Sequence, residues 1–335
     1  MGRTPLGAAL PVLAVCALLL PACSGPVDGS GSAAGRVAWV ATDASVTLPG
    51  TVLTPVDLRT RKAEAKVSVG SLPSAMAFTK GGTGLLVVTQ GDDTLHEINP
   101  ANRAVERSVG VGVEPDAVAV APGGSGGAGI ALVANLASDS VTPVDLGTWR
   151  AGPAIPVGSH PVAIAVALDS SGAATALVVD FGSDQVTPIT VRTLQAGTPI
   201  AVGPSPQAIA IASGVALVGN FGDHTLTPIV TATLQSGPPV ALPVDPTGIA
   251  VAPSGATAYI SGGASIVPLT VAGLVVGTPI QLPDVAQAVA LGAGGTTAWV
   301  ALQAGDLVPV DVPSGVVGHP IAVGGHPSAV LIDEG

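Results

Sequence analysis

The chain is built from short apolar stretches separated by turn residues. Residues 161–203 read PVAIAVALDSSGAATALVVDFGSDQVTPITVRTLQAGTPIAVG, and residues 206–242 repeat this unit segment by segment. Each copy contains four strand-like segments, which we name A (PxAIAI), B (ALVxN), C (xVTPI) and D (GxPIxVG). Alternation within segment A, as at Ala208, Ile209 and Ala210, places apolar side chains on both faces of the strand. Each small sheet should therefore pack against a neighbour on either side.

Seven copies of this unit follow one another. Segment A recurs at 73–78, 115–120, 161–166, 206–211, 246–251, 286–291 and 327–332. Four short strands in each 40–46 residues are typical of a propeller blade with A innermost and D on the outside. We predict an all-β fold over residues 36–335: a seven-bladed β-propeller of four-stranded antiparallel blades.

The phase of the repeat predicts how the ring closes. The repeats open with a segment B at 37–41 (VAWVA) and end with a lone segment A at 327–332 (PSAVLI). One blade is therefore shared between the two ends of the chain. We expect the C-terminal strand to pair beside residues 37–41, so that no blade is left incomplete.

Prolines occur in both outer segments of the repeat. Proline on the outermost strand D blunts an exposed edge, but in strand C it cannot donate to the ladder. We therefore expect strand D to pair only beyond the proline of strand C, or a bulge there. These prolines are Pro199, Pro239, Pro279 and Pro320 in D, and Pro55, Pro143, Pro188, Pro228, Pro268 and Pro309 in C.

The repeat blocks resemble a known family. The segments ALVAN (131–135), SVTPVDL (140–146), GTPIAVG (197–203) and PQAIAIA (206–212) are similar to YVTN β-propeller repeats, over roughly residues 36–335. The resemblance implies a propeller and, in many members, an extracytoplasmic surface or binding role. The chain departs from the family by its proline in strand C and by a degenerate sixth blade at 262–271.

Composition narrows the class of partner. Gly 45 and Pro 31 in 335 residues argue against a helical protein. The net charge is −11, and no Lys or Arg follows Arg192. Nucleic acid is therefore excluded as a partner, because its recognition requires a basic surface.

The N-terminus has the features of a secretory signal. Residues 1–22 contain one basic residue and an apolar stretch, and Leu20-Pro21-Ala22-Cys23 resembles the lipobox of bacterial lipoproteins. We expect cleavage before Cys23, diacylation of this residue, and a flexible tether over 23–35. The predicted location is the extracytoplasmic face of the cell membrane, with the lipid anchor as the contact to the bilayer. The alternative is an ordinary cleaved signal peptide with an incidental cysteine.

Strands B end and strands A begin at the same end of a propeller, so the B–C turns and D–A loops should form one rim around the channel. Polar residues recur there, and they could hold a polar ligand or a cation, or could be turn residues copied by the repeat. The turn aspartates Asp93, Asp139, Asp184, Asp223 and Asp306 should make this face acidic. The candidate ligand-facing residues are Ser74, Asp116, Gln207, Thr247, Gln287 and Ser328 in strand A, and Gln90, Asn135, Asp180 and Asn220 at the ends of strand B.

Motifs of known chemistry are scarce. The G-x-S-x-G pattern at 123–127 requires a strand-to-helix elbow, whereas here it lies in a Gly-rich A–B connection, so Ser125 is not predicted to be a nucleophile. We expect no cofactor, and the pattern leaves open whether a metal binds. The five histidines lack metal-ligand spacing, and we interpret them as scattered surface residues: His96, His160, His224, His319 and His326.

Two functions remain. The first is a non-catalytic binding or interaction propeller displayed outside the cell, serving an unknown protein or a small polar ligand. The second is a propeller enzyme, lactonase-like or lyase-like, with its site at the channel mouth and Asp116, Asn135, Asp180 and Asn220 as its candidates. The first is favoured because no blade breaks the repeat to bring a carboxylate, a base and metal ligands together.

Overall fold

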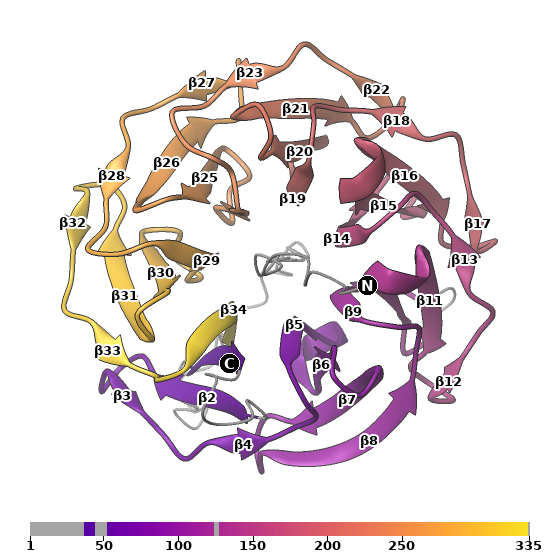
Figure 1. Ribbon diagram of the computed structural model, residues 1–335, viewed down its shortest axis with the longest axis horizontal. Helices are drawn as coiled ribbons and strands as arrows, with labels where there is room; N and C mark the ends of the chain where they lie inside the picture. Colours follow the sequence, from indigo (N-terminus) through magenta and orange to yellow (C-terminus); the bar gives the residue numbers. More distant parts are fainter. Residues whose placement is uncertain (1–36, 44–51, 124–126, 334–335) are drawn as a thin grey trace, which may run out of the picture.

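Seven small antiparallel sheets are arranged in a ring around a central axis (Figure 1). The computed structural model describes residues 37–43, 52–123 and 127–333. Cys23, the predicted signal segment, the tether and Ser125 lie outside these residues. The described chain is almost entirely strand and turn, which confirms the all-β prediction. None of its helical segments is long and apolar enough to cross a bilayer.

Each blade runs outward through strands A, B, C and D, as the repeat predicts. Blade 1 contains β34 (His326–Asp333), β1 (Val37–Asp43), β2 (Val52–Asp57), β3 (Lys62–Ala63) and β4 (Val67–Ser68). Blade 2 contains β5 (Pro73–Phe78), β6 (Leu85–Thr89), β7 (Thr94–Asn99) and β8 (Ala104–Gly110). Blade 3 contains β9 (Pro115–Ala121), β10 (Ile130–Asn135), β11 (Ser140–Asp145), β12 (Arg150–Ala151) and β13 (Ile155–Pro156).

The remaining blades follow the same plan. Blade 4 contains β14 (Pro161–Leu168), β15 (Ala174–Asp180), β16 (Gln185–Thr190), β17 (Gln195–Ala196) and β18 (Ile200–Ala201). Blade 5 contains β19 (Pro206–Ala212), β20 (Val215–Asn220), β21 (Thr225–Val230), β22 (Gln235–Ser236) and β23 (Val240–Ala241). Blade 6 contains β24 (Gly248–Val251), β25 (Thr257–Gly262), β26 (Ser265–Thr270), β27 (Val275–Val276) and β28 (Ile280–Gln281). Blade 7 contains β29 (Ala286–Leu291), β30 (Thr297–Leu302), β31 (Asp306–Asp311), β32 (Val316–Val317) and β33 (Ile321–Ala322). Short 3₁₀ turns lie at Lys80–Gly82, Leu136–Ser138 and Phe181–Ser183.

The C-terminal strand closes the ring. Strand β34 pairs antiparallel with β1, with Val40 opposite Val330 and Ala38 opposite Ile332. The last strand of the chain is thus the innermost strand of the blade that the first strand begins. The predicted closure is confirmed, and blade 1 has the same order of strands as the other blades.

The proline of strand C divides the outer strand in two. In blade 3, β12 pairs with Val144 and Asp145, whereas β13 pairs with Ser140 and Val141, so Pro143 lies opposite the gap. The carbonyl of Pro143 accepts a hydrogen bond from Gly152 N at 2.7 Å. Because N and C=O of one strand residue point the same way, the missing N–H faces the outer strand and the inner ladder stays intact. The expectation that strand D pairs only beyond the proline is wrong: D pairs on both sides of it with a gap opposite, because proline lacks the outward N–H but keeps the outward C=O.

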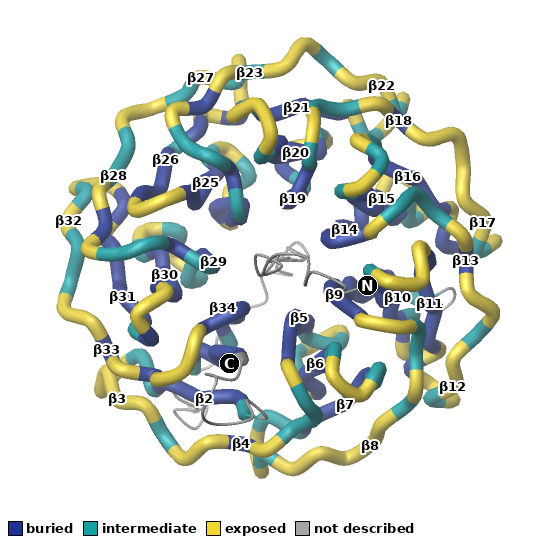
Figure 2. Tube along the Cα trace, viewed as in Figure 1, coloured by how far each residue is buried: buried dark blue, intermediate teal, exposed yellow. Residues whose placement is uncertain are grey.

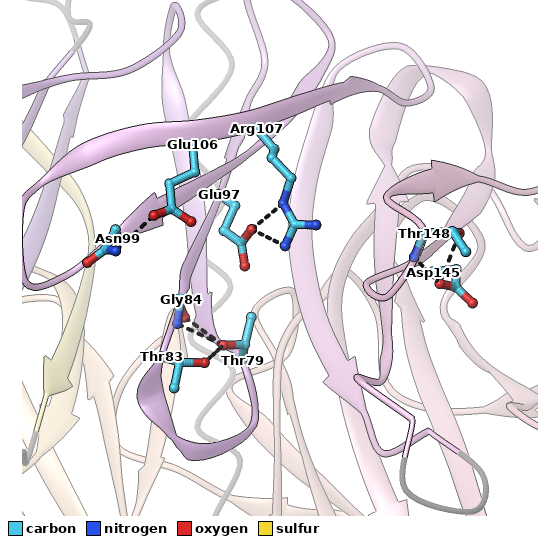
Figure 3. Close-up of polar contacts among 9 residues, drawn as sticks. All are labelled: Thr79, Thr83, Gly84, Glu97, Asn99, Glu106, Arg107, Asp145 and Thr148. Atoms are coloured by element: carbon cyan, nitrogen blue, oxygen red, sulfur yellow. Dashed lines mark hydrogen bonds and ion pairs between the residues drawn. The ribbon is translucent and has the colours of Figure 1, made fainter.

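Blade 2 lacks this proline and has a continuous outer strand. Glu97 occupies the position of Pro143, and β8 is a single strand beside it, with a register shift between Glu97 and Ile98. The buried Glu97 carboxylate accepts a hydrogen bond from Arg107 Nε at 2.6 Å (Figure 3). The Arg107 guanidinium lies 4.6 Å from the centre of the Trp149 ring in blade 3. Strand D is thus divided in blade 3, where strand C has proline, and is a single strand in blade 2, where strand C has glutamate.

The core lies between neighbouring blades. One cluster joins Trp39 and Leu53 of blade 1 to Met76 and Leu85 of blade 2, and the others span neighbouring blades in the same way. The inner strands are buried, while the outer belt and the turns are exposed (Figure 2). The packing uses small and β-branched side chains on both faces of each sheet, which explains the high mean hydropathy of a chain with few aromatic residues.

Candidate functional site

The B–C turns and D–A loops share one face of the ring, which we call the rim face. The pairing shows this directly, because Pro115 at the start of β9 lies opposite Asn135 at the end of β10. The opposite face, formed by the A–B and C–D turns, is called the tether face below. The predicted polar positions of strand A therefore lie near the rim face.

The polar residues of strand A coincide with a β-bulge. In six blades the register shifts directly after the first residue of strand A, and the bulged residue has no directly opposite partner. Bulges bend a strand and redirect the side chain, and they are frequent beside functional sites. The bulged residues are Ser74, Asp116, Val162, Gln207, Gln287 and Ser328. Thr247 instead precedes β24, and its hydroxyl donates to Ser261 O.

Two of these residues connect neighbouring blades. Ser328 Oγ donates to Pro73 O at 2.8 Å, and Ser74 Oγ donates to Pro115 O at 2.8 Å. Both serines are buried. The two bonds link blade 1 to blade 2 and blade 2 to blade 3 around the channel, so these hydroxyls are already engaged within the protein.

Asp116 is the one titratable side chain among the bulged residues. It is 1% exposed, and its Oδ1 accepts a hydrogen bond from Gln90 Nε2 of blade 2 at 2.6 Å. Its Oδ2 is buried without a hydrogen-bond partner. Burial raises the pKa of the Asp116 carboxyl well above its ordinary value, although the Gln90 bond opposes this shift, and the nearby Glu114 adds to it. Asp116 is therefore able to carry a proton at the channel mouth.

The polar residues that end strand B lie inside the blades. Asn135, Asp180 and Asn220 are all 0% exposed. Each bonds to the threonine of the Thr-Pro pair in strand C: Asn135 to Thr142 at 3.0 Å, Asp180 to Thr187 at 2.5 Å, and Asn220 to Thr227 at 2.9 Å. Sequence reasoning missed these threonines, although the repeated V-T-P pattern contained the signal.

Blade 2 varies this arrangement. Gln90 lies one residue beyond β6, so Thr89 takes the position of Asn135. Thr89 Oγ1 contacts His96 Nε2 at 3.1 Å, and His96 Nδ1 contacts Ser108 Oγ at 2.8 Å. His96 is only 9% exposed, and burial lowers its pKa. The interpretation of His96 as a surface histidine is wrong, because this imidazole replaces a buried threonine of the repeat.

Asp180 places a carboxyl where the adjacent blades have an amide. Burial raises the pKa of Asp180 to about 6, against the opposing hydrogen bonds from Thr187 and Gln185. Asn135 and Asn220 make the equivalent contacts without a charge. The Asp180 carboxyl thus has a pKa closer to neutral pH than an ordinary aspartate.

Some of the turn aspartates bind the loop that leads to the next blade. Three of them accept a backbone N–H from the following D–A loop at 2.8 Å: Asp93 from Glu114, Asp139 from His160, and Asp184 from Ser205. In blade 5, His224 takes this position and forms an ion pair with Asp245. Asp223 bonds to Thr225, and Asp306 opens β31.

The rim face is strongly acidic, as predicted. Among the residues that the structure describes, Lys66, beside Gly324, is the one Lys or Arg near this face. Within 37–43, 52–123 and 127–333, no three His, Cys, Asp or Glu side chains form a group that could hold a metal ion. The acidic residues of the face are Asp92, Asp93, Glu114, Asp139, Asp184, Asp223, Asp245, Asp284 and Asp306.

No family model matches the chain, and no curated protein matches it. Several solved structures match the chain in fold. A functionally unknown protein from Desulfotomaculum acetoxidans has a TM-score of 0.75 at 15% identity, covering 89% of this chain and 99% of its own. A candidate 6-phosphogluconolactonase from Bacteroides fragilis has a TM-score of 0.70 at 16% identity, covering 91% of this chain and 100% of its own. Hydrazine synthase from Kuenenia stuttgartiensis has a TM-score of 0.68 at 16% identity, covering 78% and 95%. At these identities the likeness concerns the fold alone, and it shows that the chain is a seven-bladed β-propeller.

Proposed function

We propose that the protein is an extracytoplasmic lipoprotein, anchored through Cys23, whose propeller is a non-catalytic binding module of the YVTN type. The acidic rim face is its interaction surface, and the partner is a protein or a small polar ligand that carries positive charge.

One observation carries this proposal: the polar groups of the rim mainly join the blades. Ser74, Ser328 and the turn aspartates Asp93, Asp139 and Asp184 all bond to backbone atoms of the next blade. An enzyme needs a base, an acid or a nucleophile that is free to reach its substrate. A rim whose donors and acceptors are engaged in this way favours a rigid binding surface with a strong negative potential.

The anchor is tested by Cys23→Ala. Diacylation supplies the two membrane signals that stable anchoring requires, so the variant should leave the membrane fraction and appear in the soluble or medium fraction. Retention of the variant in the membrane fraction would overturn the anchor.

The binding surface is tested by removing two carboxylate charges of the rim face while keeping the hydrogen bonds that these side chains accept. Asp139→Asn and Asp184→Asn keep an oxygen that can accept the His160 and Ser205 N–H groups. A photoreactive residue at Ala137, exposed on the rim face, should capture a partner in cells, and the two substitutions should abolish this capture. The same residue at Ala101, exposed on the tether face, is the matched control. Equal capture with and without the two carboxylates would contradict the proposal.

A second candidate is a lactonase-like enzyme, favoured by two observations. Two of the structural neighbours are candidate 6-phosphogluconolactonases, from Bacteroides fragilis and Bacteroides uniformis. Asp116 also offers a carboxyl with an unpartnered oxygen at the channel mouth, and burial raises the pKa of this carboxyl. The acidic rim opposes a phosphorylated substrate, so an uncharged lactone is the better probe. Hydrolysis that is lost in Asp116→Asn would establish this function in place of the first.

A further inference from the structure

The chain enters the propeller on the tether face. Val37, the first residue of β1, lies opposite Asp57 at the end of β2 and opposite Asp333 at the end of β34. Residues 24–36 connect this point to Cys23. A random-coil chain of that length spans roughly 20 Å on average.

The average span of this connection favours one orientation of the propeller on a membrane. To place the rim face against the bilayer, the connection would first have to run the length of β1. Seven residues of strand span about 24 Å at ~3.4 Å each, which exceeds the average reach. The tether face therefore lies nearer to the lipid of an acylated Cys23 than the rim face does.

The positive charges lie on the same face. Arg59, Arg61 and Lys62 are exposed on the C–D turn of blade 1, where the chain enters, and Lys80 is exposed on the neighbouring A–B turn of blade 2. Further cations follow on the C–D turns of blades 2, 3 and 4, at Arg103, Arg150 and Arg192, of which Arg103 forms an ion pair with Glu64. This face also carries the carboxylates of Asp57, Asp145, Asp169 and Asp311, so the cations gather only on the turns of blades 1 and 2.

Exposed apolar side chains also lie mainly on the tether face. Most of the exposed large hydrophobic residues lie at strand ends on the tether face: Val105, Leu168, Val230, Val275 and Val316. A surface with exposed cations and scattered apolar side chains suits the headgroup region of a bilayer. The acidic rim face would be repelled by anionic lipid.

We propose that the tether face rests on an anionic bilayer surface, with the turns of blades 1 and 2 in contact with lipid headgroups and the rim face turned away from the membrane. This inference rests on the proposed anchor at Cys23. It gives the anchored propeller an orientation, which leaves the acidic rim accessible from outside.

The cysteine content permits a direct test. Cys16 and Cys23 are the only cysteines of the chain, so the mature acylated protein should have no free thiol. Ala101→Cys reports on the tether face and Ala137→Cys on the rim face, and both positions are exposed turn residues. Each full-length acylated protein is reconstituted into vesicles of phosphatidylcholine, with or without phosphatidylglycerol, and labelled with a bulky maleimide.

The orientation predicts different labelling rates for the two positions. Phosphatidylglycerol should slow the labelling of Ala101→Cys several-fold and leave Ala137→Cys unchanged. Adding Arg59→Gln, Arg61→Gln and Lys62→Gln should restore the faster rate, because each cation strengthens contact with an anionic surface about fivefold. Lys66→Gln, which removes one charge near the rim face, should not restore it.

The possible failures are distinct. Labelling of the parent protein would mean that Cys23 is free, which overturns the proposed anchor together with the orientation. An unlabelled parent, with equal rates for Ala101→Cys in both lipids or a slower rate for Ala137→Cys, would overturn the orientation alone.

Discussion

Replacing Asp180 by Asn should stabilise the protein. Asp180 lies fully buried at the end of β15, where the adjacent blades have Asn135 and Asn220. In those blades the amide Nδ2 donates to the threonine hydroxyl of strand C. The amide introduced by Asp180→Asn could donate to Thr187 in the same way, so the substitution removes a buried charge without removing the contact.

The magnitude follows from the pKa of Asp180, which burial raises from 3.8 to about 6. Each tenfold change in proton affinity is worth about 1.4 kcal/mol, so the ionised carboxylate lowers the unfolding free energy by up to about 3 kcal/mol. Because the pKa is higher in the folded state, protonation favours folding. The cost is complete above about pH 6, falls as the pH drops, and vanishes below about pH 4. Asp180→Asn should therefore gain about 1–3 kcal/mol at about pH 8 and almost nothing at about pH 4.

Urea unfolding of both proteins between these pH values measures this difference. Asp223→Asn is the control, because Asp223 is an exposed carboxyl on the rim face and its loss changes the net charge equally. An Asp180→Asn protein that is destabilised at about pH 8, or whose gain is the same at every pH, would refute the argument that burial of charge dominates.

Further predictions concern the links between blades and the group at the channel mouth. Ser74→Ala and Ser328→Ala should each lower the unfolding free energy by about 1–2 kcal/mol in urea titration, because each removes the hydroxyl that donates to a proline carbonyl of the next blade. Unchanged stability would mean that these bonds do not stabilise the contact between blades. Asp116→Asn should raise the melting temperature at neutral pH and lose this advantage in acid, because burial raises the pKa of the Asp116 carboxyl. A lower melting temperature at neutral pH would contradict the raised pKa of the Asp116 carboxyl.

The repeat made the architecture predictable. The recurrence of segment A gave the number of blades, and the phase of the repeat gave the pairing of β34 with β1. The prolines of strand C predicted a disturbed strand D, but D pairs on both sides of them rather than only beyond, and the inner ladder survives because the missing N–H faces outward. The first two inferences succeed because each depends on local pattern copied seven times.

The chemistry of the rim was less predictable, because it depends on contacts between blades. Asp93 and Glu114 are 21 residues apart, and nothing in their spacing indicates that the carboxylate binds the next loop. The ends of strand B were expected to face a ligand, yet Asn135 is buried against Thr142. Gln90 was placed one residue out of register because the strand pattern of blade 2 carries no sharp end.

Removal of the last strand tests the closed ring most directly. A chain that ends at residue 325 lacks β34, which buries Ala329, Val330, Leu331 and Ile332 beside β1. Amide hydrogen exchange should then show lost protection at Val37–Asp43 while the strands of blade 4 keep theirs, together with a lower melting temperature. Unchanged protection of Val37–Asp43 in the shortened chain would contradict the closure on which the account depends.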